Sequence, residues 1–156
     1  MSVWKNLLNR AVNSVVPESW AAAFSRLAHE DLMKAFTGCC ALVVCADNVV
    51  EESEVDKVRE YIRSNLKLLK GYDAGVVMRQ FNEYVDITKC DPDEGRDSVY
   101  KVLQEIKTDA ESCKTLVRIC CKLGAAGSDF NEAEKQVIKG ICEQLNVDFR
   151  EFKEIC

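Results

Sequence analysis

Acidic side chains gather in two short stretches of the chain, where their oxygens could bind a hard divalent cation. The first, CADNVVEESE at residues 45–54, follows the apolar run TGCCALVV. The second, GAAGSDFNEAE at residues 124–134, follows LVRICCKL. Calcium and magnesium both prefer oxygen ligands. The two stretches therefore form a candidate site for calcium or magnesium, with the expected ligands Asp47, Glu51, Glu54, Asp129 and Glu134.

The same carboxylates also have a structural explanation as helix caps. In a capping box, the N-cap side chain is paired with a Glu three positions later. Asn131 with Glu134 fits this pattern, and Glu51 with Glu54 fits it with a poorer cap. The stretch DNVVEESE has neither the oxygen spacing nor the sixth-position glycine of an EF-hand. Capping accounts for Glu54 and Glu134, but it gives no required role to Asp47, Glu51, Glu52, Asp129 and Glu132.

Cysteine is the second residue type that could carry chemistry. The chain has nine, at positions 39, 40, 45, 90, 113, 120, 121, 142 and 156. No C-x-x-C pair occurs, and the single histidine, His29, cannot complete a zinc site of the usual Cys/His spacing. We expect a reducing compartment without disulfides, with most cysteines acting as small buried hydrophobic residues. Cys90 and Cys156 are the expected exposed thiols.

A thiol-based function is the alternative hypothesis, in which cysteines bind or reduce soft oxyanions or metals. Cys39, Cys40 and Cys45 lie on one segment, and Cys120 and Cys121 lie on another. If the two segments pack face to face, several thiols converge. Burial among Leu and Val would raise their pKa values and make them unreactive.

Nothing in the sequence indicates an enzyme. It contains no Ser/His/Asp order, no Gly-rich phosphate loop and no metal-hydrolase motif. A Cys/His dyad would need His29 beside one of the cysteines. Partner binding is the simpler prediction, and the segments KLLKGYD and EGRDSVYK are expected to present mixed charge and aromatic side chains in loops.

Length and composition indicate one soluble globular domain. The chain has 156 residues, of which 47% are hydrophobic, so it can build a core. Its formal net charge is −5, which disfavours binding to nucleic acid. The N-terminus lacks the apolar region of a signal peptide, and no apolar run approaches the roughly 20 residues that span a bilayer. We therefore expect a cytoplasmic protein without direct membrane insertion.

Apolar residues recur at helical spacing along the whole chain, and no segment alternates with the period of a strand. The pattern predicts an all-α bundle of about seven to nine helices. His29-Glu30-Asp31 is an expected helix start, Asp73, Asp109 and Asn131 are expected N-caps, and Asp148 starts a short final helix. CDPDEGRD, with Pro92 and Gly95, is the strongest predicted turn. Helices starting near Glu51 and Asn131 follow the acidic stretches.

The two acidic stretches align when the chain is shifted by 80 residues. Only four of 30 pairs are identical between 37–66 and 117–146, but the order of features is the same. Each copy has an apolar helix, a polar turn, one apolar residue, a cap and an amphipathic helix. We expect a single domain over 1–156, with an N-terminal helical extension at 1–28 and related halves at 29–70 and 109–150.

At these residues the sequence resembles the TerB family of tellurite-resistance proteins. The family pattern is A-D-G-x-(apolar)-(S/T/D)-x-x-E after an apolar helix, occurring twice. ADNVVEESE follows it with Asn48 for Gly and Glu51 for the cap, and AGSDFNEAE follows it at Phe130, Asn131 and Glu134. Gly127-Ser128 replace Asp-Gly in the second copy, which puts a symmetric metal site in doubt. The resemblance covers roughly residues 30–150.

The resemblance implies a non-catalytic cytoplasmic scaffold of a stress-response system, involved in tellurite and oxidant resistance. It implies action through partners, namely other tellurite-resistance proteins and a TerC-like membrane protein, which would recruit the chain to the inner face of the membrane. It also implies divalent-cation binding at the acidic turns.

Overall fold

The computed structural model describes residues 29–46, 52–64, 73–125 and 132–152. Within these ranges the chain is helical and contains no strand, which confirms the all-α prediction. The elements are α3 (His29–Val44), α4 (Glu52–Ser64), α5 (Ala74–Cys90), α6 (Pro92–Ile106), α7 (Ala110–Ala125), α8 (Glu132–Leu145) and the 3-10 turn η2 (Phe149–Phe152). The described part therefore holds six α-helices, and the expected total of seven to nine is not confirmed. The N-terminal extension, residues 1–28, lies outside it.

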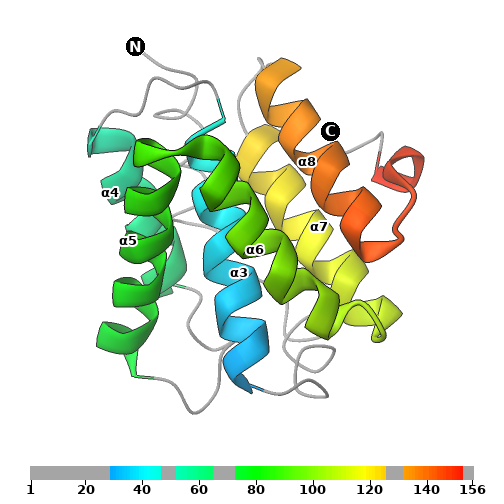
Figure 1. Ribbon diagram of the computed structural model, residues 1–156, viewed down its shortest axis with the longest axis horizontal. Helices are drawn as coiled ribbons and strands as arrows, with labels where there is room; N and C mark the ends of the chain where they lie inside the picture. Colours follow the sequence, from blue (N-terminus) through cyan, green and yellow to red (C-terminus); the bar gives the residue numbers. More distant parts are fainter. Residues whose placement is uncertain (1–28, 47–51, 65–72, 126–131, 153–156) are drawn as a thin grey trace.

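Helix α3 is the centre of the bundle. It contacts all five other α-helices, and in Figure 1 it lies behind α6, with α4 and α5 on one side and α7 and α8 on the other. Its sequence is apolar or small on nearly every face, as a fully buried helix requires. Phe36, Cys39 and Val43 have no exposed surface, and neither does the one hydroxyl residue, Thr37. The Thr37 hydroxyl donates to the Met33 carbonyl at 2.8 Å, so its burial leaves no unpaired donor.

A single residue joins α5 to α6, which corrects the predicted turn over CDPDEGRD. Asp91 is extended and caps α6, its side chain accepting from the backbone N–H groups of Asp93 and Glu94 at 3.1 and 3.2 Å. Pro92 occupies the first turn of the helix, where its missing N–H costs nothing. Gly95, expected in the turn, is a buried residue of α6 itself. A Cβ there would come within 2.7 Å of the Thr88 Cα, so glycine is needed where the two helices cross.

Several helices begin at the residues that the sequence predicts. Helix α3 begins at His29, as expected, and the Asp109 side chain accepts from the Ser112 N–H at 3.3 Å at the start of α7. Asp73 lies at the N-cap of α5 but makes no side-chain cap hydrogen bond. Asp148 precedes η2 and accepts from the Arg150 N–H at 2.9 Å, which confirms the short final helix. Asn131, the other expected cap, lies outside the described residues.

Helix α8 ends in a Schellman motif that the sequence analysis did not predict. Asn146 has φ 56°, in the left-handed region. The Val147 N–H donates to the Cys142 carbonyl at 2.9 Å, and the Asn146 N–H donates to the Glu143 carbonyl at 3.4 Å. These bonds satisfy carbonyls of the last turn, and they send the chain back so that Phe152 packs into the core.

The helix bounds agree with the 80-residue shift. Helices α3 and α4, at 29–44 and 52–64, become 109–124 and 132–144, and α7 and α8 lie at 110–125 and 132–145. Helices α5 and α6 fill the interval between the two pairs in the chain. The agreement concerns element positions, and the relationship between the halves at 29–70 and 109–150 stays a prediction.

Candidate functional site

The predicted metal ligands fall mostly outside the described part of the chain. Asp47, Glu51 and Asp129 lie there, and the side chain of Glu54 on α4 is likewise outside it. Glu134 is described, and it is buried in the first turn of α8 with only 1% of its surface exposed. Among the described residues, no group of three or more His, Cys, Asp or Glu side chains could hold a metal ion.

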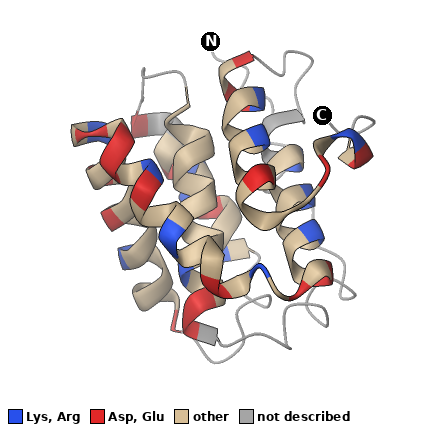
Figure 2. Cartoon of the chain, turned by 45° about the vertical axis from the view of Figure 1, so that its right-hand side comes forward, with Lys and Arg blue, Asp and Glu red and all other residues tan. Residues whose placement is uncertain are grey.

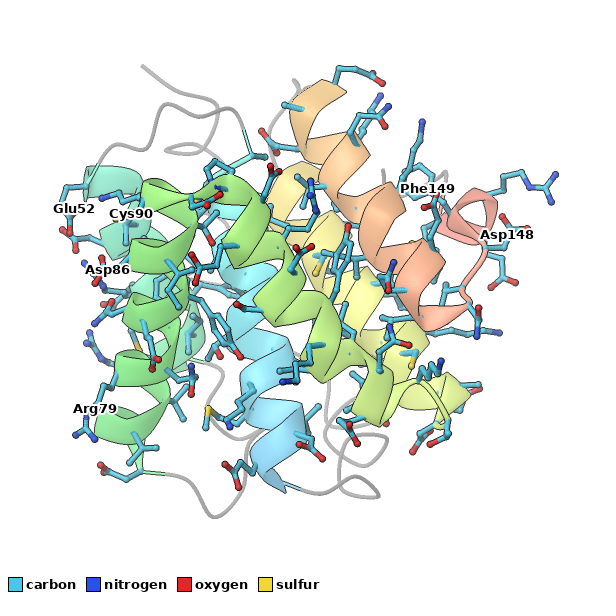
Figure 3. All side chains as sticks on the ribbon, viewed as in Figure 1. Glu52, Arg79, Asp86, Cys90, Asp148 and Phe149 are labelled. Carbon is cyan, nitrogen blue, oxygen red and sulfur yellow. The ribbon has the colours of Figure 1, made fainter. Side chains whose placement is uncertain are left out.

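Glu52 has a structural role that the sequence analysis did not assign. Its carboxylate accepts from Arg59 at 3.0 Å and lies 3.6 Å from the ammonium of Lys89 on α5. The hydrogen bond and the charge of Arg59 lower the pKa of Glu52. Arg59 also pairs with Asp56 and donates from Nε to Oδ1 of Asn82 at 2.7 Å. This network ties α4 to α5 on the outer face where Glu52 and Cys90 are labelled in Figure 3.

Glu132, the corresponding residue of the second copy, has a local partner. Its side chain is exposed and accepts a hydrogen bond from the Gln136 amide at 3.1 Å, one turn further along α8. The two equivalent carboxylates thus have different kinds of partner. Glu52 links two helices, whereas Glu132 bonds within its own.

An open pocket of about 370 Å³ lies where α3 ends and where α6 and α8 begin. This volume is within the usual range of small-molecule sites. Its location places it beside the ends of the two acidic stretches, because Ala46 and Ala133 both line it. The lining is largely apolar, with a few polar groups: Leu42, Cys45, Ala46, Thr88, Pro92, Arg96, Tyr100, Ala133, Gln136 and Val137.

Arg96 is the only cation among the described residues that line this pocket. It lies on α6, where its guanidinium is 3.1 Å from a carboxylate oxygen of Asp93 and 3.8 Å from one of Asp97. The segment EGRDSVYK is therefore helical rather than a loop, although it does present Arg96 and Tyr100 to a concave surface. Acidic and basic residues are interspersed over the helices in Figure 2, so no continuous basic face is visible in this view.

Buried thiols from three helices lie in the core. Cys120 of α7 lies close enough to Cys39 and Cys40 of α3 and to Cys142 of α8 to interact electrostatically with their thiols. All four are at most 1% exposed. The two cysteine-bearing helices, α3 and α7, do pack against each other, and the convergence of their thiols stays a prediction. Cys142, on α8, was not expected near them.

Three of these thiols, those of Cys39, Cys40 and Cys142, have pKa values above the ordinary value and are neutral. The hydrogen bond to Cys120 and burial raise the pKa of Cys39, and burial raises the pKa of Cys40. Burial also raises the pKa of Cys142 to about 12. Since the thiolate is the reactive species, these cysteines are poor nucleophiles.

Among the remaining cysteines, Cys121 contradicts the prediction that the chain has no disulfides. Cys113 is a separate buried thiol that donates to the Ile106 carbonyl at 3.3 Å, and Cys90 is exposed as predicted. Cys121 is disulfide-bonded, contrary to the expectation of no disulfides. Cys156, the other expected exposed thiol, lies outside the described residues.

The sequence analysis missed the pocket, because its lining comes from the ends of four helices. The available signal was Arg96 and Tyr100, which lie four residues apart and so share one face of a helix. Which thiols of α3 and α7 come near one another depends on how the two helices are rotated about their axes, and the sequence does not show this.

Comparison with known proteins gives one match. The family model described as tellurite resistance protein TerB matches residues 33–155, which is most of the chain. Searches of curated proteins and of solved structures each returned no match. Within the described residues, no helix combines the length and apolar character needed to cross a membrane.

Proposed function

Because the chain belongs to the TerB family of tellurite-resistance proteins, we propose that it is a non-catalytic scaffold of a cytoplasmic stress response. In this role it confers resistance to tellurite and oxidants by binding other proteins. The family match is the observation that carries the proposal. The buried, neutral thiols support a role other than direct chemistry on an oxyanion.

The end of the bundle that holds the pocket is the proposed partner site. The pocket combines an apolar lining with Arg96 and the phenol of Tyr100, a mixture that suits an inserted side chain. The exposed carboxylates of Asp93 and Asp97 lie 3.1 and 3.8 Å from the Arg96 guanidinium, and the exposed Glu132 precedes the lining residue Ala133. Within the pocket, Arg96 suits an acidic or polar side chain of the partner, whereas the net charge of −5 suits basic residues of the partner outside it.

The proposed partners are other tellurite-resistance proteins, including a TerC-like membrane protein. Such a partner would recruit the chain to the inner face of the membrane without insertion of the chain itself. The described helices suit this arrangement, because none of them is able to span a bilayer.

We also propose that a divalent cation, calcium or magnesium, binds the acidic turns through Asp47, Glu51, Glu54, Asp129 and Glu134. Clustered carboxylates repel one another, so a bound cation should stabilise the folded chain by mass action. Millimolar calcium should raise the melting midpoint, and Asp47→Asn should weaken this rise. Glu54→Gln tests the cap and should lower the midpoint with or without calcium. If calcium moves neither the wild type nor Asp47→Asn, the turns do not bind this ion.

The scaffold role is tested in a host that carries a tellurite-resistance system but lacks its own member of this family. The wild-type chain should restore growth on tellurite, and native affinity capture from cytosol and membranes should recover the partners. Arg96→Glu, in the pocket, should reduce both growth and recovery.

Arg79→Glu is the matched control, because Arg79 is an exposed arginine on α5 and is not part of the pocket lining. Equal loss for both variants would show that general charge matters rather than the pocket. Turnover of a substrate by the purified chain would contradict the non-catalytic role.

The alternative function, thiol-based handling of soft oxyanions or metals, is favoured by one observation. Cys39 and Cys120 interact electrostatically although they come from helices far apart in the sequence. Their burial opposes rapid reaction with an oxyanion. It does not oppose slow binding of a soft cation.

A further inference from the structure

We propose that the pocket between the end of α3 and the starts of α6 and α8 binds a free small molecule, a monocarboxylate with an apolar body. Binding of this ligand does not rest on the scaffold role. Only its consequence does, because the ligand would occupy the space that a partner's side chain would otherwise enter.

The charges around the pocket favour an anion over a cation. Among the described lining residues, Arg96 is the only charged side chain, so no carboxylate of this set faces a ligand. Pro92 and Ala133 line the pocket from the first turns of α6 and α8. A helix N-terminus carries a partial positive charge, and the C-terminal end of α3 contributes the opposite sign. One formal cation and two N-termini therefore outweigh one C-terminus.

Arg96 has donors left for a ligand. Its Nη2 lies 3.1 Å from a carboxylate oxygen of Asp93, and its Nε lies 3.8 Å from one of Asp97, which is beyond hydrogen-bond length. Both carboxylates are exposed, so these surface ion pairs hold the guanidinium only weakly. The guanidinium has five N–H donors, and Nη1 takes part in neither pair. A ligand carboxylate can therefore accept two of them side by side.

Tyr100 supplies a second polar contact. It lies one helical turn after Arg96 and lines the pocket, and its phenol oxygen lies against Gly140 of α8. Within the described part of the chain this hydroxyl makes no hydrogen bond, so its proton is available to a ligand oxygen. Burial raises the pKa of Tyr100, which keeps the phenol protonated.

The rest of the described lining limits the size and the charge of the ligand. It is largely apolar, with Leu42 on one side and Val137 on another. The volume of about 370 Å³ is near the lower end for small-molecule sites, which suits a short hydrocarbon chain or a single ring. A second negative charge would meet Asp93 and Asp97 and no further cation among the described lining residues, so a monoanion is favoured.

A free acid suits this pocket better than an acidic side chain of a partner. Asp or Glu brings the carboxylate on a short methylene stem, which would leave the apolar walls at Leu42 and Val137 uncovered. A longer apolar body covers them, and burial of apolar surface is the main favourable contribution to binding in such a site. The carboxylate then sets the orientation of the ligand.

The test is a titration of the isotope-labelled full chain with sodium octanoate, below its micelle-forming concentration, followed by NMR. We expect saturable shifts of the backbone amides of Cys45, Arg96, Ala133 and Val137, which all line the pocket. Two comparison probes each lack one half of the ligand. They are 1-octanol, which has no charge, and N-acetylglutamate amide, which has no apolar chain, and both should bind more weakly than octanoate.

Arg96→Gln should lower the octanoate affinity by about 10–100-fold, the loss expected when a hydrogen bond to a charged group is removed. It should leave the affinity for 1-octanol unchanged, which separates loss of the charge from a change in the shape of the pocket. Tyr100→Phe should lower the octanoate affinity by about 2–10-fold. Arg79→Gln is the matched control, because Arg79 is an exposed arginine of α5 outside the pocket lining, and it should leave the affinity unchanged.

Three results would overturn the proposal. They are the absence of saturable shifts at the pocket, equal octanoate affinity in the wild type and Arg96→Gln, and binding of either comparison probe as tight as that of octanoate. Tight binding of N-acetylglutamate amide would assign the pocket to a partner's acidic side chain instead. Arg96 and Arg79 are both exposed, so neither substitution should unfold the bundle, and circular dichroism checks this.

Competition with a partner is tested separately, by native affinity capture with and without octanoate. Octanoate should reduce recovery of the partners by the wild-type chain. Unchanged recovery at saturating octanoate would overturn the competition. The titration uses the purified chain alone, so failure of the ligand site and failure of the scaffold role are distinguishable.

Discussion

The phenol oxygen of Tyr100 on α6 lies directly over the backbone of Gly140 on α8. A Cβ at position 140 would meet this oxygen closer than real Cβ atoms approach any neighbour, whereas the ring carbon that carries it would be at an ordinary 3.5 Å. The contact joins the side of the bundle that contains α5 and α6 to the side that contains α8. It also fixes the ring of a residue that lines the pocket.

This contact predicts a specific coupling between two substitutions. In a Tyr100→Phe background, Gly140→Ala should raise the free energy of unfolding by about 1 kcal/mol, the helix-propensity advantage of Ala over Gly. In the wild-type background the gain should be smaller or reversed, because the new methyl meets the hydroxyl. Urea denaturation of the four proteins in the cycle measures the coupling. Equal effects of Gly140→Ala in both backgrounds would contradict the contact.

The crossing of α5 and α6 predicts a larger loss at Gly95. Gly95→Ala should lower the free energy of unfolding by about 1–3 kcal/mol, the usual cost of overpacking, because its Cβ would meet Thr88, including the Thr88 Cα at 2.7 Å. Gly75→Ala is the control, since its Cβ would meet only the exposed Asp73 side chain at 3.0 Å. Thermal and urea melts should rank Gly95→Ala well below Gly75→Ala, and the reverse order would mean that the helices cross elsewhere.

Two aspartates at N-cap positions should differ in their contribution to stability. Asp91→Ala should cost about 1 kcal/mol, the usual value for a cap, because its side chain accepts two backbone hydrogen bonds at the start of α6. Asp73→Ala should cost less, since Asp73 makes no side-chain cap hydrogen bond at the start of α5. Chemical denaturation of the two variants compares them. A larger loss of stability for Asp73→Ala would contradict the assignment of Asp91 as the stronger cap.

Alkaline pH should destabilise the protein because its buried cysteine thiols keep their protons in the folded state. Burial raises the pKa of Cys142 from the ordinary 9.0 to about 12 and that of Cys113 to about 11. Between these values the unfolded chain has lost the thiol proton and the folded chain retains it, so the free energy of unfolding falls as pH rises. Each such thiol should contribute a slope of up to about 1.4 kcal/mol per pH unit.

Removing the Cys142 thiol tests whether this residue contributes to the pH dependence of stability. Cys142→Ala should make the free energy of unfolding fall less steeply between pH 9 and pH 12, by the contribution of up to one proton. This change in slope is expected whatever the substitution does to stability at neutral pH. Urea melts over this pH range give the slope. An unchanged slope would mean that Cys142 titrates alike in the folded and unfolded chain.

The sequence predicts the helices better than the site, for reasons visible in particular residues. The spacing of Val99, Leu103 and Ile106 predicts α6, because each helix buries one face. Gly95 was misplaced in a turn, because the sequence does not show that Thr88 of the preceding helix lies against it. Composition predicts burial of the cysteines, but not which of them meet. Whether Cys39 lies near Cys120 depends on rotations of α3 and α7 about their axes that the pattern of apolar residues leaves open.

The candidate site shows the same limit. Glu52 and Glu132 are equivalent in the sequence alignment, yet among the described residues Glu52 pairs with Lys89 of another helix as well as with Arg59 of its own, whereas Glu132 bonds to Gln136 of its own helix. The pocket is likewise formed by the ends of separate helices. Apart from the four-residue spacing of Arg96 and Tyr100, no local sequence pattern indicates such a surface.

The one-residue junction at Asp91 has a consequence for the order of folding. Helices α5 and α6 can pair after closing almost no loop, so little chain entropy is lost before their contacts form. Contacts of this local kind favour fast folding, and we expect the α5–α6 hairpin to be structured in the transition state. Gly95→Ala should then mainly slow folding, while Gly140→Ala in the wild-type background should act mainly on the unfolding rate. Stopped-flow kinetics would show the opposite pattern if α7 and α8 paired first.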